Sequence, residues 1–381
     1  MQKIEFFKHN IGPREIRDVN RVLRGLFLTT GKEVERFERA LADYLGLPYA
    51  VGVTSCTAAL QLSLTALGVG PQDEVITTPM SFVATATAAI QAGARPVFVD
   101  VEPGTGNLNA ELLEAAITTR TKAIVPVHLY GQLCDMTRIR EIADRHNLAV
   151  AEDAAHALEA SRNGVRPGEL GDAACFSFYA TKSITCGEGG AVAVKSEDLA
   201  RKLKALRHHG MDRSAAERYQ KDDPTYEITM MGWKYNMDNI QAALLIGQLE
   251  RVGSLHRKRQ RLAASYRAGL SAVRGIKLMA LSPNSTHAHH LFTILVPPGK
   301  RNEFIRRMNA RGIGVSVHYF PIHLHRYFRD TFGYRRGMFP EAEQIGARVV
   351  ALPLYPKLKA AEVDYVIRSV KDIAAELKFA D

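Results

Sequence analysis

Between residues 49 and 194, short runs of apolar and β-branched residues alternate with longer stretches of helical character. Strands separated by helix-length connections typically pair in parallel, with the helices crossing over the faces of their sheet. This pattern predicts an α/β domain built on a mostly parallel sheet. The predicted strands are 50–53, 74–77, 96–99, 123–127, 148–151 and 191–194, and the predicted helices are 58–67, 84–91, 110–117 and 139–146.

The pattern changes after a long helical segment, which the sequence predicts over about 238–270. We predict an N-terminal arm with a large α/β domain over 1–254, and a smaller C-terminal α+β domain over 255–381. The arm is expected to form two helices, the first opened by Gly12-Pro13 because proline suits the first turn of a helix. The elements predicted for the smaller domain are a strand at 291–296, a helix at 301–311, a strand at 314–318 and a helix at 361–377.

The composition is ordinary for a soluble protein, with 46% hydrophobic and 24% charged residues, and 381 residues are enough for two packed domains. No run approaches the roughly 20 apolar residues of a membrane-spanning helix, and the first residues lack the apolar core of a signal peptide. The four cysteines are dispersed without a Cys-x-x-Cys pair, which favours buried thiols over disulfides or a thiolate zinc site. We therefore expect a cytoplasmic protein with no membrane insertion.

The formal net charge of +10 is compatible with a nucleic-acid surface, an anionic small substrate or only a solvated exterior. The densest basic run, Arg257-Lys258-Arg259-Gln260-Arg261, lies in the long helical segment and has no aromatic residue between its cations. No recognised nucleic-acid reading module accompanies the run. We interpret it as a solvated helix face and expect no nucleic-acid partner.

The segment most informative about chemistry is Phe176-Ser177-Phe178-Tyr179-Ala180-Thr181-Lys182, which leads into a glycine cluster at 187–190 and then a strand. A lysine in covalent cofactor chemistry must be desolvated, so that its pKa falls far enough for the amine to be nucleophilic. Hydroxyl and aromatic neighbours suit an amine held near an anionic cofactor. Taken alone, a lysine in a loop is more often solvated surface, so the hypothesis needs partners.

A first partner is Asp153, which follows the predicted strand 148–151 and falls where the carboxyl edge of the sheet is expected. Ligands of open α/β sheets bind at that edge. An acid there can keep a pyridine nitrogen protonated and so make the ring an electron sink. The alternative is an aspartate that only caps the next helix.

A second partner is the run Thr54-Ser55-Cys56-Thr57-Ala58, where the predicted strand 50–53 turns into a helix. Unpaired backbone amides and the positive end of the helix dipole make such a turn a phosphate cradle, to which hydroxyls add donors. Ser177 offers a further hydroxyl, and simple N-capping is the alternative. The anion cradle, the acid at a strand end and the lysine beyond it fall where one cofactor would need them.

These motifs occur in the order Thr-Ser-Cys-Thr-Ala, Glu152-Asp153-Ala154-Ala155-His156, and Phe-Ser-Phe-x-x-x-Lys with Gly-Glu-Gly-Gly. The order resembles the nucleotide-sugar aminotransferases called the DegT/DnrJ/EryC1/StrS family. The resemblance implies a fold-type I aminotransferase that depends on pyridoxal 5'-phosphate, with a large cofactor-binding domain and a smaller C-terminal α+β domain. Further matches spread over nearly the whole chain are 27–31, 73–79, 209–210, 235–243 and 352–356.

The resemblance also implies roles for individual residues. Lys182 would bind the cofactor as an imine and carry the proton between substrate and cofactor carbons, and Asp153 would pair with the pyridine nitrogen. The other implied cofactor contacts are His156 beside the ring hydroxyl, Phe82 and Ala155 on the two ring faces, Thr57, Ala58 and Ser177 at the phosphate, and Asn236 from the neighbouring subunit. The last assignment implies a homodimer with shared active sites.

By the same resemblance, L-glutamate donates the amino group and a keto sugar on a nucleoside diphosphate accepts it. Segments 184–188, 234–236 and 317–319 look most like enzymes that aminate C4 of UDP-linked 4-keto sugars, including those of lipid A modification. Many relatives have Asn and Arg where this chain has Lys234 and Asn236, which favours that group without selecting the sugar. The candidate substrate contacts are Thr30, Lys234, His318 and Tyr319, with Arg24 a further candidate.

Several alternatives stay open or are set aside. Some related proteins lack the lysine and act as regulators or dehydratases, so Lys182 favours transamination over both. A lysine-bearing regulator, or an aminotransferase for a 3-keto sugar or a dTDP- or GDP-linked sugar, remains possible. Histidines cluster at 287–290 and 318–325 without a carboxylate or thiolate pattern, so no metal is expected. The glycines at 187–190 precede a strand instead of opening a helix, which excludes a dinucleotide-binding fold.

Overall fold

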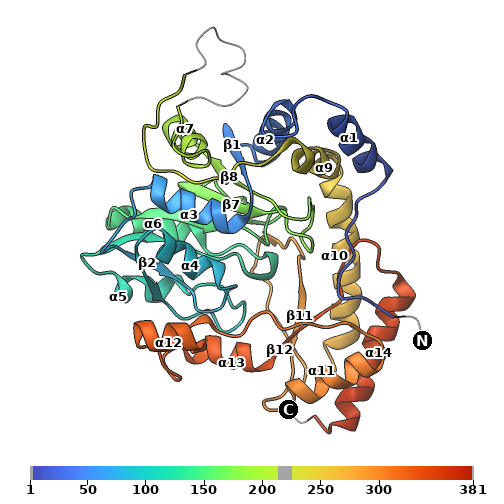
Figure 1. Ribbon diagram of the computed structural model, residues 1–381. Helices are drawn as coiled ribbons and strands as arrows, with labels where there is room; N and C mark the ends of the chain where they lie inside the picture. Colours follow the sequence, from blue (N-terminus) through green and yellow to red (C-terminus); the bar gives the residue numbers. More distant parts are fainter. Residues whose placement is uncertain (1–2, 213–224, 380–381) are drawn as a thin grey trace.

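The computed structural model describes residues 3–212 and 225–379, and within these ranges it contains one large sheet of seven strands (Figure 1). Their order is β1-β8-β7-β5-β4-β2-β3, and β8 alone runs opposite in direction to the other six strands. The prediction of a mostly parallel α/β sheet is therefore confirmed. The strands are β1 Tyr49–Val53, β2 Glu74–Thr77, β3 Arg95–Phe98, β4 Thr121–Ile124, β5 Ala149–Asp153, β7 Ala173–Ser177 and β8 Gly190–Val194.

Helices cover both faces of the large sheet. Successive side chains of a strand point to opposite faces, so each strand packs against both layers. On β8, Val192 and Val194 pack into one apolar cluster, whereas Ala191 and Ala193 pack into another on the other face. This two-sided burial explains why the strands read as nearly continuous apolar runs. The helices of this part are α1 Pro13–Leu23, α2 Lys32–Leu45, α3 Cys56–Ala66, α4 Ala84–Gln91, α5 Leu113–Ala116, α6 Met136–Arg145, α7 Glu197–Leu206 and α9 Asn239–Glu250.

The C-terminal part has a small antiparallel sheet of order β12-β11-β9 with helices packed around it (Figure 1). The predicted strand at 291–296 and the helices at 301–311 and 361–377 are confirmed to within a few residues. The elements are α10 Val252–Leu270, β9 Lys277–Leu278, β11 Phe292–Leu295, α11 Arg301–Ala310, α12 Arg326–Phe332, α13 Pro340–Arg348, β12 Val349–Leu352 and α14 Ala360–Glu376; a two-stranded pair joins β6 Ser161–Arg162 to β10 Ser285–Thr286.

The helix α10 connects the two parts of the molecule. Its first residue, Val252, packs with residues of α2 and α9, whereas Tyr266 and Leu270 pack into the C-terminal cluster. Ile4 of the N-terminal arm also belongs to that cluster and forms a β-bridge with Ile313. The domain division at 254/255 remains a prediction, and it falls within the first turn of α10.

Three predictions in this region are wrong in detail. The helix predicted over 238–270 is two helices that meet at Arg251, whose guanidinium binds both oxygens of the buried Glu15 carboxylate. The strand predicted at 314–318 makes only one bridge, from Ser316 to Ala351, because the chain leaves the small sheet there and runs toward Tyr319. Arg259 of the basic run is buried and not solvated, while its neighbours in the run remain at the surface or half-buried.

Gly190 fixes the distance between the start of β8 and the start of α3. A Cβ atom at this position would lie 2.4 Å from the Ser55 carbonyl carbon and 2.6 Å from the Cys56 nitrogen. Both are backbone atoms, which cannot move aside as the end of a side chain can. Only glycine therefore permits this close approach.

We predict that Gly190→Ala lowers the free energy of unfolding by about 1–3 kcal/mol, the usual cost of overpacking. Denaturant titration measures the change, with Gly70→Ala as the control because a Cβ at Gly70 would meet no atom within 4 Å. Equal free energies of unfolding for the two variants would show that the close approach carries no constraint.

Candidate active site

Lys182 lies in the loop that connects β7 to β8, at the carboxyl end of β7. Its backbone nitrogen donates to the Tyr179 carbonyl over 2.9 Å, and Cys186 N donates to the Phe178 carbonyl over 3.1 Å, so the loop is closed on itself. The side chain is half-buried, and burial among protein atoms lowers the pKa of Lys182 to about 8, although Cys56 and Asp153 oppose this shift. A large share of the amine is therefore neutral near pH 8.

Asp153 ends β5, the parallel neighbour of β7, so both residues lie at the same edge of the sheet. Its side chain is buried, Oδ2 accepts from Thr85 Oγ1 over 2.7 Å, and Oδ1 accepts from Ala155 N over 3.2 Å. Thr85 Oγ1 lies 2.8 Å from Ser81 Oγ. A turn and not a helix follows Asp153, so the alternative of a helix cap is wrong.

His156 of the large-sheet part and Tyr319 of the C-terminal part are hydrogen-bonded to each other near Asp153. His156 Nδ1 accepts from Tyr130 N over 3.2 Å, and its Nε2 lies 3.2 Å from Tyr319 Oη. Burial, assisted by the charge of Lys182, keeps the pKa of His156 well below its usual range, so the ring is neutral. A neutral ring that accepts at Nδ1 carries its proton on Nε2, and we assign Nε2–H as the donor to Tyr319.

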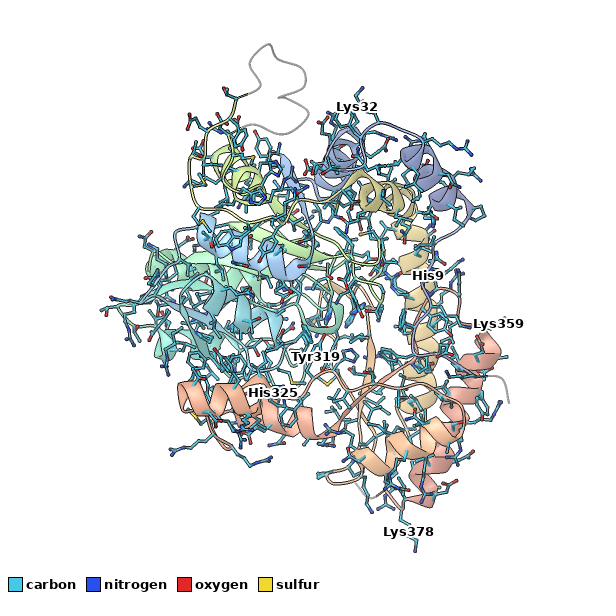
Figure 2. All side chains as sticks on the ribbon, in the orientation of Figure 1. His9, Lys32, Tyr319, His325, Lys359 and Lys378 are labelled. Carbon is cyan, nitrogen blue, oxygen red and sulfur yellow. The ribbon has the colours of Figure 1, made fainter. Side chains whose placement is uncertain are left out.

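His318 and Tyr319 come from the C-terminal part, and Figure 2 shows Tyr319 between the large sheet and the C-terminal helices. The Tyr130 hydroxyl donates to the His318 carbonyl, which ties this segment to the large sheet. Burial, with the charge of Lys182, lowers the pKa of His318 to about 4. Its Nδ1 is buried and has no hydrogen-bond partner among the described residues.

Phe82 stands beside this group with an unusual exposure for a phenylalanine. Its side chain is 58% exposed, and its ring centroid lies 6.1 Å from that of Tyr319. Three residues further on, Thr85 holds the Asp153 carboxylate. A solvent-exposed aromatic face next to a buried acid and a half-buried amine suits a planar aromatic ligand.

The start of α3 is capped in part by its own sequence. Ser55 Oγ accepts from Ala58 N over 3.1 Å, so N-capping is confirmed for this serine. The remaining amides of the first turn have no partner within the helix. Ser177 pairs with Gly190 across β7 and β8, and Gly190 abuts Ser55, so the Ser177 hydroxyl belongs to the same neighbourhood as Thr57 and Ala58.

Three further predicted site residues lie around the end of β1, where Asn236 forms a β-bridge with Val53. Asn236 Nδ2 donates to Thr30 Oγ1 over 2.7 Å, and both residues line a cavity of about 1480 Å³ bordered by α1, α2 and α7. Lys234 is exposed and forms a β-bridge with His208. Within the part of the chain that the structure describes, no hydrogen bond or ion pair links any of the three to Lys182 or Asp153.

Several residues of the site were missed in the sequence. Ser81 and Thr85 flank Phe82 in the segment after β2, and their spacing of four residues was the available signal for a hydroxyl pair. His290 belongs to the histidine cluster for which the sequence predicts no metal, and its ring centroid lies 4.4 Å from that of His156. Over residues 3–212 and 225–379, no group of three metal-ligating side chains is present, and no helix is long and apolar enough to cross a membrane.

Comparison with known proteins identifies the family. A model of the DegT/DnrJ/EryC1/StrS aminotransferase family matches residues 9–371. The spore coat polysaccharide biosynthesis protein SpsC of Bacillus subtilis is 42% identical over 369 residues, 95% of each chain. The chain therefore belongs to this family and is a pyridoxal-phosphate-dependent sugar aminotransferase.

Solved structures agree with this membership. DesV of S. venezuelae is 37% identical, with a TM-score of 0.88 over 94% of both chains. A Streptococcus pneumoniae protein in its PMP form is 32% identical, with a TM-score of 0.93 over 98% of this chain and 100% of that chain, and the same protein has been solved in its PLP form. The predicted fold class and the predicted cofactor are confirmed.

The residues at the sheet edge fit pyridoxal phosphate. The exposed Phe82 ring can stack on a pyridine ring, the buried Asp153 carboxylate can pair with its nitrogen, and the half-buried Lys182 amine can reach its aldehyde. The first-turn amides of α3 and the Ser177 hydroxyl are suited to its phosphate. This set of groups matches a phosphorylated pyridine aldehyde.

We predict that Lys182 of the cofactor-free protein titrates far below an ordinary lysine. Because burial lowers its pKa, the amine is protonated and unreactive below about pH 8 and free above it, whereas an ordinary lysine needs a pH of roughly 10.4. Acetylation by acetic anhydride, followed peptide by peptide by mass spectrometry across pH 6–11, measures the midpoint. A midpoint for Lys182 equal to that of the bulk lysines would contradict the burial argument.

Proposed function

We propose that this enzyme transfers the amino group of L-glutamate to C4 of a UDP-linked 4-keto sugar, yielding an amino sugar and 2-oxoglutarate. One observation carries the chemistry: the half-buried Lys182 amine shares a sheet edge with the buried Asp153 carboxylate, beside an exposed aromatic ring. The family supplies the substrate class, a sugar.

Within this proposal, Lys182 is the residue that bonds the cofactor and moves protons. When bound, pyridoxal phosphate supplies a ring that accepts the electrons left on the substrate carbon. The lowered pKa of Lys182 lets its amine both accept a proton from that carbon and return it near neutral pH. We expect His156 and Tyr319, which are hydrogen-bonded to each other, to restrict how a substrate binds.

The proposed role of Asp153 is to hold positive charge on the ring nitrogen. Its carboxylate is fixed by the hydrogen bonds from Thr85 and from the Ala155 amide, so it does not need to reorganise during the reaction. The proposed cofactor set is Lys182, Asp153, His156, Phe82, Thr57, Ala58, Ser177 and, from a second copy of the chain, Asn236.

The homodimer is part of the proposal because the resemblance assigns Asn236 to the site of a second copy of the chain. Asn236 and Thr30 are hydrogen-bonded to each other beside a large cavity, and no hydrogen bond or ion pair of the described residues links either to Lys182 or Asp153. A second copy that presents this pair to the site would complete the phosphate and substrate contacts. Lys234, His318 and Tyr319 are the remaining proposed substrate contacts.

Two observations support the UDP-linked 4-keto sugar and the proposed use of its product. Lys234 and Asn236 stand at positions that resemble those of enzymes aminating C4 of such sugars. SpsC, a relative of similar length, is described as a protein of spore coat polysaccharide biosynthesis. We propose an amino sugar destined for a surface polysaccharide.

We predict that Asp153→Asn slows the half-reaction with L-glutamate by roughly 10²-fold to 10³-fold, the usual loss when a preorganised charge is removed from a reacting group. Stopped-flow measurement of the loss of visible absorbance gives the rate. Asp144→Asn is the matched control, since Asp144 is exposed on α6 and its side chain is ion-paired with Arg140, away from Asp153. An unchanged rate in Asp153→Asn would mean that another group holds the ring nitrogen.

The direct test of the reaction starts from protein loaded with pyridoxamine phosphate. Adding UDP-4-keto sugars is expected to restore the visible absorbance, with 3-keto sugars and dTDP- or GDP-linked sugars as comparisons. Lys182→Ala is the control and should restore it at least roughly 10²-fold more slowly. If only another class of nucleotide sugar restores the absorbance, that class replaces the proposed substrate. If no keto sugar restores it, the protein is better explained as a cofactor-binding regulator.

A further inference from the structure

The loop that carries Lys182 is fastened to two helices outside the sheet. On its C-terminal side, the Gln248 side chain of α9 pairs with the backbone of Thr185, donating to its carbonyl over 2.7 Å and accepting from its nitrogen over 3.2 Å. Gln248 is completely buried. This paired amide holds the loop three residues beyond the lysine.

A second fastening lies directly beside the lysine. Ser183 Oγ donates to Glu159 Oε2 over 3.1 Å, and the other oxygen of Glu159, Oε1, is ion-paired with the guanidinium of Arg259 in α10. The side chains of Glu159 and Arg259 are 2% and 3% exposed. Arg259 Nε also donates to the Ala288 carbonyl over 3.3 Å.

A buried ion pair is poor evidence for stability, because removing both charges from water offsets much of their attraction. The ion pair does, however, restrict the orientation of the Glu159 carboxylate. Because Arg259 holds one oxygen of the Glu159 carboxylate, the other oxygen points in a fixed direction. The Ser183 hydroxyl donates a hydrogen bond to that oxygen. The main chain next to Lys182 is thereby tied to a helix that also packs in the C-terminal cluster.

We propose that Glu159 is a positioning residue for Lys182, acting through the Ser183 hydroxyl and fixed in turn by Arg259. The proposal rests on the proposed function insofar as Lys182 is the lysine that bonds the cofactor. The structural consequence concerns this chain alone: without the Ser183 anchor, the segment directly after the lysine loses its tie to α10, and the amine gains access to water.

Cofactor-free protein provides the test. In Ser183→Ala, the ion pair between Glu159 and Arg259 remains, so no buried charge is left unpaired. The hydrogen bond from Ser183 to Glu159 is lost. The midpoint for acetylation of Lys182 by acetic anhydride should then rise from about 8 by about one pH unit, as the amine becomes more hydrated. Ser183→Thr retains the hydroxyl and should keep the wild-type midpoint.

The matched control is Ser254→Ala, which removes a serine hydroxyl bonded to the Arg251 carbonyl in the first turn of α10. It should leave the Lys182 midpoint unchanged. The charged and titratable groups that interact with Lys182, namely Cys56, Asp153, His156, His290 and His318, are the same in all these variants. A difference in midpoint therefore reports the position of the loop.

A double variant, Glu159→Leu with Arg259→Met, tests whether the anchor acts through Ser183. Replacing both charges avoids an unpaired buried ion, and circular dichroism checks that the protein folds. The double variant should raise the midpoint as Ser183→Ala does, and combining all three changes should raise it no further. Additive shifts would mean that Ser183 and Glu159 act independently and would overturn the proposal.

The failure of this inference differs from the failure of the proposed function. If pyridoxal phosphate protects wild-type Lys182 from acetylation but Ser183→Ala leaves the midpoint at its wild-type value, the positioning role is wrong and the cofactor lysine stands. If the cofactor protects a different lysine, the assignment of Lys182 is wrong, while the shift in Ser183→Ala can still be observed.

Discussion

The partial burial of the Lys182 amine within reach of the Asp153 carboxylate is the constraint on which the rest of the site depends. Burial favours the neutral amine and the acid opposes this preference, and the balance places the pKa of the lysine at about 8. A fully solvated lysine would stay protonated and a more deeply buried one would lose its proton altogether. The chain holds its amine between these limits, where it can take and return a proton near neutral pH.

The parallel sheet places the lysine and the acid whose interaction sets this pKa at the same edge. Because β5 and β7 are parallel neighbours, the end of one presents Asp153 at the edge where the loop after the other begins. Gly190 lets the start of α3 approach the same edge, and the segment through Tyr319 closes the site from the C-terminal part. The site therefore draws on elements more than 100 residues apart in sequence, and its geometry depends on how well the two parts pack.

The sequence predicted most of the α/β part because strands and helices there alternate with clear periodicity, and it placed Lys182 and Asp153 at one edge. It missed β7, because the apolar run Ala173–Ser177 merges with the lysine motif and looks like a loop. It also took Arg259 for a surface residue, because its partner Glu159 is 100 positions away and no local pattern shows the pairing. The hydroxyls of Ser81 and Thr85 were missed for the same reason, since their meaning depends on where Asp153 lies. Family resemblance supplied the cofactor, and periodicity alone could not have done so.

The most direct measurement of the central claim is to find which residue bonds the cofactor. Protein loaded with pyridoxal phosphate is reduced with borohydride, digested, and its peptides are analysed by mass spectrometry. The account predicts the mass of the reduced cofactor on Lys182, with the visible absorbance of the protein lost in proportion to the modification. Modification of a different lysine, or bound cofactor that reduction attaches to no residue, would contradict it.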